Sequence, residues 1–253
     1  MATLVSFHAH PDDESIACGG VMRKAHEDGH RVVLVVATRG EVGEVTDGFL
    51  DEGEELWERR VRETHAAADV LGASRVEFLG YRDSGMMGEP TNDVPGTFWT
   101  ASVDEAAERL AAILREEAAD VLTVYDDHGS YGHPDHIQVH RVGVRAAELA
   151  GTPKVYQSTI NRDRAMAGRS GGDVEMPDLP PDFGTPEADI TVAVDVTPWV
   201  SYKRKAMRAH ASQISEESFF LALPDEAFAF AFGTEWFIRE GGGPGITETD
   251  LMA

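Results

Sequence analysis

Short apolar runs alternate with longer segments of helical periodicity along most of the chain, and this alternation restricts the fold more than any other feature. The expected strands are residues 3–9, 31–38, 75–79, 120–125, 154–159 and 189–196. The expected helices are residues 14–28, 54–71, 104–117, 136–150 and 198–211. Apolar strands separated by helices are typical of a mostly parallel sheet covered on both faces. The sequence therefore predicts an α/β fold with a Rossmann-like, doubly wound sheet, whose ligands bind beyond the carboxyl ends of the strands.

The length of 253 residues suits one domain with a single core, and no internal repeat or interdomain linker interrupts it. We therefore expect one domain over residues 1–253. Between about residues 161 and 189, Pro, Gly and acidic residues replace the periodic pattern. This segment is expected to be a long irregular loop, either a lid over the active site or a surface excursion without a role. The apolar segment 219–237 is expected to pack in the core.

The composition excludes several classes of protein. An excess of 45 acidic over 22 basic residues argues against a nucleic-acid partner, because such a chain repels phosphate backbones. Cys18 has no second cysteine to pair with, so we expect a buried, inert thiol. No secretory signal and no apolar run of membrane-spanning length is visible, so the expected location is cytoplasmic, without a membrane partner. The sequence leaves a homo-oligomer open.

Two motifs with similar chemistry follow two of the expected strands. The first, HAHPDDE, spans residues 8–14, and the second, YGHPDH, spans residues 131–136. In each, a proline is well placed to open a helix. Either motif alone could be an ordinary helix start, since the helix dipole favours carboxylates in the first turn. Together they place imidazoles and carboxylates at the same edge of a parallel sheet.

This set of side chains suits a divalent metal. His10, Asp13 and His136 would supply three protein ligands and leave positions open for water and substrate, as in catalytic zinc sites. A set of two histidines and one carboxylate also serves Fe(II), so the metal could be either, and an Fe(II) oxygenase is a competing enzyme class. Those oxygenases usually have β-barrel folds, whereas this chain is predicted to be α/β.

Other polar residues of the two motifs are left for catalysis. Asp12 could accept a proton from activated water, and His133 could act as the acid on the opposite side. Asp135 could orient the ring of His133, as carboxylates beside metal sites often do. Spacing alone does not separate these roles from ordinary surface charge.

Several segments together resemble a known family. HPDDE near the N-terminus and HPDH after the fourth strand are accompanied by ATRGEVGEV, RVRET, FLGYRDSGM and KRKAMRAHASQ. The chain resembles the PIG-L/LmbE-like zinc de-N-acetylases over most of residues 1–215, and especially the mycothiol-pathway branch of deacetylases and amidases. The resemblance implies a zinc-dependent hydrolase that acts on a linear amide bond.

The resemblance also implies roles for individual residues. It implies that His10, Asp13 and His136 bind the metal and that Asp12 is the general base. His133, with Asp135 as its partner, would stabilise the tetrahedral intermediate and protonate the leaving amine, and Tyr131 would assist at the oxyanion. The sugar hydroxyls would be bound by Glu41, Arg62 and Asp83. His210 and Gln213 stay ambiguous between the pocket and the helix surface.

The implied reaction removes an N-acetyl group from an N-acetylglucosamine-containing small molecule or conjugate similar to the mycothiol precursor, and releases acetate and a free amine. The amidase members of the branch tend to carry a lysine directly after HPDDE, where this chain has Ile16 and Ala17. That difference favours deacetylation over cleavage of a larger N-acyl group. A non-catalytic sugar-binding homologue is the third alternative, although it would be expected to lose Asp12 or His133 first.

Overall fold

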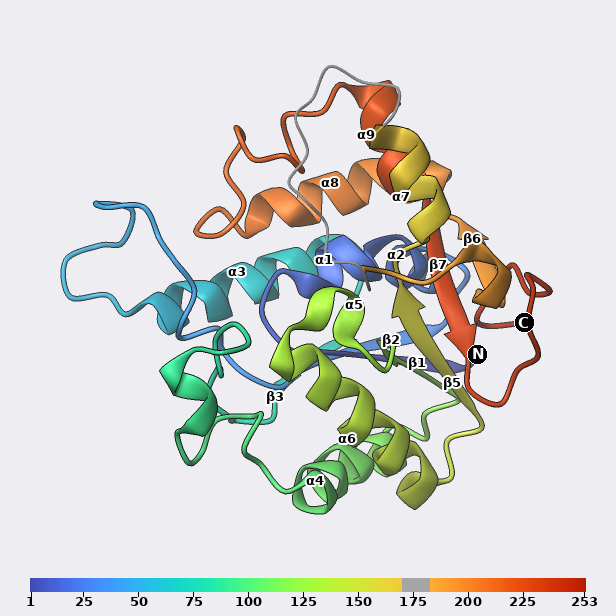
Figure 1. Cartoon of the computed structure of the whole chain (residues 1–253), viewed down its shortest axis with the longest axis horizontal. Helices are drawn as coiled ribbons and strands as arrows, with labels where there is room; N and C mark the ends of the chain where they lie inside the picture. Colours follow the sequence, from blue (N-terminus) through green and yellow to red (C-terminus); the bar gives the residue numbers. More distant parts are fainter. Residues whose placement is uncertain (170–182) are drawn as a thin grey trace.

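The computed structural model describes residues 1–169 and 183–253, and these form a seven-stranded sheet with helices on both faces (Figure 1). The strands are β1 Thr3–His8, β2 Arg31–Val36, β3 Arg75–Phe78, β4 Val121–Tyr125, β5 Lys154–Thr159, β6 Val192–Asp195 and β7 Thr234–Arg239. Their order in the sheet is β3-β2-β1-β4-β5-β7-β6. The first five strands pair in parallel, and β7 runs antiparallel to both β5 and β6. The predicted mostly parallel α/β fold is confirmed.

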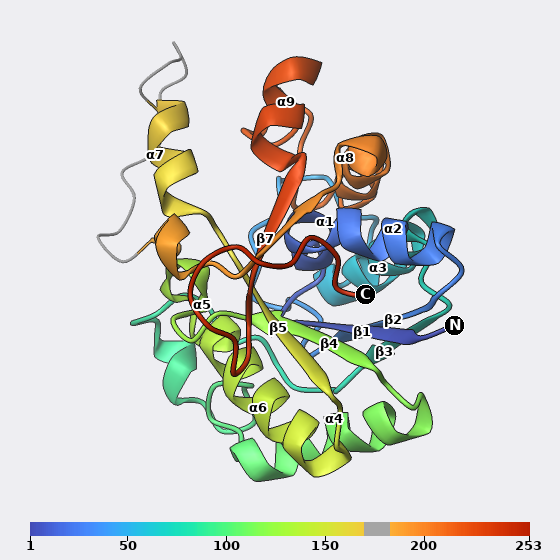
Figure 2. The same ribbon diagram turned by 90° about the vertical axis from the view of Figure 1, so that its right-hand side faces the viewer.

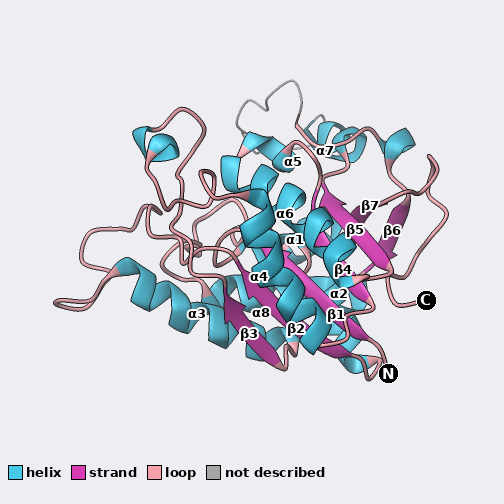
Figure 3. Ribbon diagram, turned by 90° about the horizontal axis from the view of Figure 1, so that it is seen from below, coloured by secondary structure: helices cyan, strands magenta, loops and turns pink. Residues whose placement is uncertain are grey.

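Helices cover both sides of the sheet (Figures 1 and 2). The helices are α1 Asp13–Ala17, α2 Gly19–Glu27, α3 Leu56–Leu71, α4 Val103–Glu116, α5 Gly129–Gly132, α6 Pro134–Ala150, α7 Arg162–Arg169, α8 Val200–Ala209 and α9 Asp225–Phe232, with 3₁₀ turns η1 Pro90–Asp93, η2 Glu187–Asp189 and η3 Thr197–Trp199. Helices α4 and α6 pack their apolar stripes on one face of the sheet, which Figure 3 shows from that side. Helices α2, α3 and α8 cover the other face, and α7 and α9 lie further out beyond α8 (Figures 1 and 2).

Local sequence explains where these helices begin and end. At the start of α3, the Glu55 side chain and the Glu58 side chain each accept the other residue's backbone N–H, which satisfies two amides of the first turn. The same helix ends at Gly72, whose φ of 82° is left-handed and costs little only for glycine. Ser102 caps α4 through its hydroxyl oxygen, which accepts from the Glu105 amide.

The helix expected over residues 14–28 is two helices, which corrects that expectation. The helix is interrupted at Cys18, which is both the C-cap of α1 and the N-cap of α2. Gly20, two residues later, lies so close to Val196 that a Cβ on it would be 2.4 Å from the valine Cβ. Cys18 itself is fully buried, and burial raises the pKa of its thiol to about 12. A protonated, buried thiol agrees with the inert role expected for it.

The C-terminal third differs most from the expectation. The apolar segment 219–237 contains helix α9 and most of strand β7, and β7 was not anticipated as a strand. Residues 161–189 are not irregular throughout, because α7 and η2 lie within them; residues 170–182 of the expected loop lie outside the described residues. Within the described chain, no helix is both long enough and apolar enough to cross a membrane.

Candidate active site

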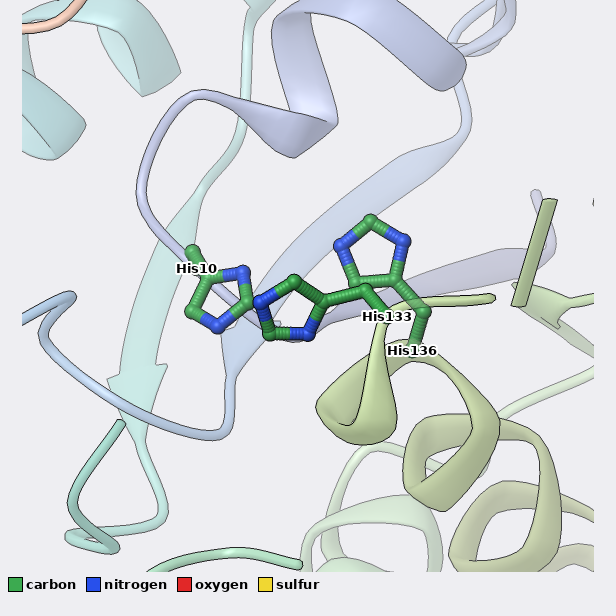
Figure 4. A group of neighbouring side chains, drawn as sticks. All are labelled: His10, His133 and His136. Carbon is green, nitrogen blue, oxygen red and sulfur yellow. The ribbon is translucent and has the colours of Figure 1, made fainter. Parts of the chain in front are cut away.

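The two HPD motifs meet at the carboxyl edge of the sheet, where the chain order reverses. Strand β1 lies between β2 and β4, so the segments that follow β1 and β4 are neighbours at this point. Figure 4 shows the three histidine rings gathered there, His10 from the segment after β1, and His133 and His136 from the start of α6. Their ring centroids lie 4.6 to 5.5 Å apart, and all three side chains are buried.

Asp13 lies between two of these rings. Its Oδ2 atom is 3.3 Å from His10 Nδ1 and 3.4 Å from His136 Nε2. Both ring nitrogens of His136 are buried and have no hydrogen-bond partner among the described residues. Imidazole nitrogens without a hydrogen-bond partner and a carboxylate oxygen, close together in a buried site, are the ligand atoms that zinc binds. The structure therefore brings together the three residues expected to hold a metal, and the site fits one.

Carboxylates face His10 from more than one side. Its Nε2 atom lies 3.2 Å from Asp135 Oδ2 and 3.4 Å from Asp83 Oδ1. Burial alone would lower the pKa of His10, but Asp83, Asp13 and Asp135 outweigh it and raise that pKa well above its usual value. Two sets of three residues have their ligand atoms within 4.8 Å of one another: His10 with His133 and His136, and His10 with Asp83 and Asp135. The carboxylate excess is what a divalent cation at this point would offset.

Asp135 occupies a different place from the one its spacing suggested. Its carboxylate is fully buried, accepts from the backbone amide of Ser84 (2.9 Å) and from the Ser84 hydroxyl, and faces His10. Its contact with His133 is made by its backbone amide, which donates to His133 Nδ1 over 3.1 Å. The expectation that the Asp135 carboxylate orients the His133 ring is therefore corrected: that carboxylate orients His10, as carboxylates commonly do for metal-binding histidines.

His133 is fixed as the N-cap of helix α6. Because its Nδ1 accepts a backbone N–H, that nitrogen carries no proton and the ring proton is on Nε2. Burial, together with the neighbouring His10 and His136, lowers the pKa of His133 to about 3. The ring in this arrangement is a neutral hydrogen-bond donor.

Asp12 has a backbone conformation that only glycine adopts easily. Its φ is 102°, which typically costs on the order of 1–3 kcal/mol for another residue. Burial raises the pKa of its carboxyl to about 6, against the opposing effect of the Arg60 guanidinium, whose Nη2 lies 3.5 Å from Asp12 Oδ2. Backbone strain at a carboxylate that is only 18% exposed and lies beside the metal cluster is typical of functional sites.

Tyr131 lies at the mouth of the site. It is 40% exposed, and its ring centroid is 5.0 Å from that of His136. The preceding Ser130 has the strained angles φ 62° and ψ −52°, with its amide bonded to Asp126 Oδ1 and its carbonyl bonded to the Gly184 amide. Tyr131 therefore follows a turn whose backbone is fixed by hydrogen bonds at both the amide and the carbonyl of Ser130.

The expected sugar-binding residues divide between those at the site and one away from it. Glu41 and Asp83 are adjacent, because the Asp83 amide donates to Glu41 Oε2 over 3.1 Å. The side chain of Arg62 is 59% exposed and pairs with Glu54, so the structure does not bring it to the cluster. Arg60, two residues earlier on α3, is buried beside Asp12 instead.

Helical periodicity could have identified Arg60. The buried positions of α3 include Arg60, Glu63, Thr64 and Ala67, which are spaced by three, four and seven residues and share one face. Arg62 is outside this stripe. Tyr125 was also missed; it stacks on His136 with ring centroids 4.3 Å apart and an interplanar angle of 14°.

Comparison with known proteins then decides the family. The PIG-L family, described as GlcNAc-PI de-N-acetylase, matches residues 5–147, more than half of the chain. This chain belongs to the PIG-L family. It is 43% identical to a 1D-myo-inositol 2-acetamido-2-deoxy-alpha-D-glucopyranoside deacetylase of Nocardiopsis dassonvillei, over 97% of this chain and 98% of the relative. It is 42% identical to the protein of the same name from Streptomyces avermitilis, over 98% and 96% of the two chains.

A solved structure agrees in fold. The N,N'-diacetylchitobiose deacetylase of Pyrococcus horikoshii aligns with a TM-score of 0.62 and 24% identity, over 94% of this chain and 83% of that one. The predicted resemblance to PIG-L/LmbE-like deacetylases is confirmed, and with it the prediction that the chain is an amide hydrolase of the deacetylase class.

Proposed function

We propose that this chain removes the N-acetyl group from an N-acetylglucosaminyl conjugate of inositol, and so releases acetate and the free amino sugar. The observation that supports this most is the identity of about two residues in five with inositol-linked GlcNAc deacetylases along almost the whole length of both chains. The clustered His10, Asp13 and His136, with Asp12 beside them, supply the groups that amide hydrolysis needs.

The metal that we propose is zinc, held by His10, Asp13 and His136. The donor set of two imidazoles and one carboxylate, with an unsatisfied His136 nitrogen, supports it, and Asp135 would fix the orientation of His10 from behind. When bound, such an ion lowers the pKa of water and polarises the amide carbonyl. Metal analysis of the purified protein would distinguish zinc from iron.

In the proposed reaction Asp12 transfers the proton. Its carboxylate takes a proton from water as the oxygen attacks the acetamide carbon, and returns that proton to the nitrogen as the carbon–nitrogen bond breaks. A carboxyl pKa near 6 suits a group that must both accept and release a proton. The resemblance gives His133 two tasks, to stabilise the tetrahedral intermediate and to protonate the amine; because its neutral ring caps α6 through Nδ1, the proton that it can offer is on Nε2. We assign that Nε2–H, with the Tyr131 hydroxyl, to the oxygen on which negative charge develops.

Glu41 and Asp83 are proposed to hold the sugar. Both are carboxylates at the rim of the cluster, and carboxylate oxygens accept from sugar hydroxyls. Asp83 Oδ1 already accepts from the Gly85 amide, so its orientation is fixed before a ligand arrives. This keeps the glucosaminyl ring beside His10, where the acetamide must lie.

The test is a panel of N-acyl amino sugars assayed for free amine, with and without a chelator. We expect amine release from N-acetylglucosaminyl-inositol that stops on metal removal and returns with added zinc. Asp12→Asn should keep the metal and lose the activity. Faster release from conjugates with a larger N-acyl group would make the chain an amidase, and sugar binding without amine release would make it a binding protein.

A further inference from the structure

A buried pair, Glu14 and His210, lies directly behind the proposed base and has no role in the mechanism above. His210 Nε2 is 2.6 Å from Glu14 Oε1, and both side chains are fully buried. The two residues are 196 positions apart, since Glu14 is in α1 and His210 follows α8. His210 lies beyond residues 5–147, the part of the chain that matches the family.

The other oxygen of Glu14 holds the base. Glu14 Oε2 accepts the backbone N–H of Asp12 over 3.1 Å, and the carbonyl oxygen of Pro11 accepts from Arg60 Nη2 over 2.6 Å. These are the two polar atoms of the peptide bond that enters Asp12. Both polar atoms of the peptide bond between Pro11 and Asp12 are therefore hydrogen-bonded to side chains, directly before the residue, Asp12, whose φ is 102°.

Glu14 is in turn held by neighbours that suit an ionised carboxylate. Oε1 accepts from the Ser15 hydroxyl over 2.7 Å as well as from His210. The Glu14 side chain is therefore held at Oε1 by Ser15 and His210, and presents Oε2 to the Asp12 amide.

We infer that His210 and Glu14 are positioning residues, which hold the peptide of Asp12 in its strained conformation and so aim the base. This inference rests on the proposed function, because it gives Asp12 the role assigned above. The three residues form a series of contacts, in which His210 at the end of α8 contacts Glu14 in α1, and Glu14 contacts the backbone of Asp12. Misplacement of a reacting group by about 1 Å can cost on the order of 100-fold in rate.

The first test uses His210→Ala and His210→Gln. We expect His210→Ala to lower kcat by on the order of 100-fold, with KM and bound metal almost unchanged, because Asp12 is misaimed while the ligands and the sugar contacts stay. His210→Gln keeps an N–H donor within reach of Glu14 and should recover much of the loss. A kcat equal to wild type in folded, metal-loaded His210→Ala would overturn the inference.

Ser212→Ala is the matched control. Ser212 is buried two residues further on, and its hydroxyl donates to Glu63, so the change also removes a hydrogen bond to a carboxylate from the same segment. It does not touch Glu14 or Asp12, so kcat should stay at the wild-type value. An equal fall in kcat in both variants would mean that any disturbance of this segment slows the enzyme, and would also overturn the inference.

A crystal structure of His210→Ala separates this inference from the proposed function. We expect the hydrogen bond from the Asp12 amide to Glu14 to be lost, and the φ angle of Asp12 to change from 102° to a negative value. Retention of the contact and of a φ near 102° would refute the positioning role, whatever the enzyme acts on. If wild-type protein deacetylates nothing in the panel, the proposed function fails, and this structural comparison still decides the inference.

Discussion

The buried pair of Lys203 on α8 and Glu235 on β7 gives the sharpest prediction for stability. Lys203 Nζ lies 2.6 Å from Glu235 Oε1, and both side chains are 2% exposed. The Glu235 carboxylate also accepts the backbone amides of Gly20 and Val21 over 2.7 and 2.8 Å, at the start of α2. One carboxylate therefore joins a strand and two helices, and three of its neighbours are donors.

Lys203→Met removes the cation and leaves the carboxylate buried with only the two amides. Breaking a buried pair in this way typically costs about 3–5 kcal/mol. At roughly 2–4 °C per kcal/mol for a chain of this size, the melting temperature should fall by on the order of 10 °C. Lys203→Met combined with Glu235→Gln removes the unpaired charge and keeps an acceptor oxygen for one of the two amides, so part of the stability should return.

Urea unfolding followed by circular dichroism measures these differences, with Arg208→Met as the control. Arg208 is on the same helix but pairs with Glu216 at the surface, where its side chain is 46% exposed, and its loss should leave the unfolding midpoint unchanged. A Lys203→Met protein as stable as wild type would refute the reasoning. So would a double variant less stable than the single one, because the unpaired charge would then not be the cause.

Three further predictions follow from the geometry of the site and the core. His136→Ala should abolish metal binding and amine release together, as elemental analysis and the amine assay would reveal; a fully loaded variant would remove His136 from the ligand set. Arg60→Met should lower kcat by about 10- to 100-fold because the cation beside the base is lost, whereas Arg62→Met should be silent; equal effects would contradict the placement of the two side chains. Gly20→Ala places a Cβ 2.4 Å from that of Val196 and should destabilise the fold by about 1–3 kcal/mol in urea unfolding, and an unchanged midpoint would show that the contact relaxes.

The sequence was informative about the parallel core because its strands are buried on both faces and so read as unbroken apolar runs. β2 is such a run, and all of it except Arg31 is buried. β7 was missed because it alternates, with Glu235 buried as an acceptor inside it. A glutamate in an apolar segment gives no local sign that two distant helix amides and a lysine will satisfy it.

At the site, the sequence indicated which residues gather but not how each side chain is turned. The repeated HPD turns were sufficient to bring His10, Asp13 and His136 to one sheet edge. Spacing could not reveal that Asp135 turns its carboxylate to His10, since that contact depends on how α6 meets the segments after β1 and β3. Such choices are made by tertiary packing, which local patterns do not record.

The strand order β5-β7-β6 has a consequence for synthesis on the ribosome. Strand β6 pairs with β7 and, at one isolated bridge, with Glu248, both of which come later in the chain. It therefore has no partner when it first emerges, and must wait for about forty more residues before it can join the sheet. Glu235 of β7 also accepts the backbone amides at the start of α2, so a hydrogen-bonded contact of the N-terminal half forms only after β7, the last strand of the sheet to be synthesised. A nascent chain that stops short of β7 should carry the histidines and aspartates of the site and still lack a finished enzyme.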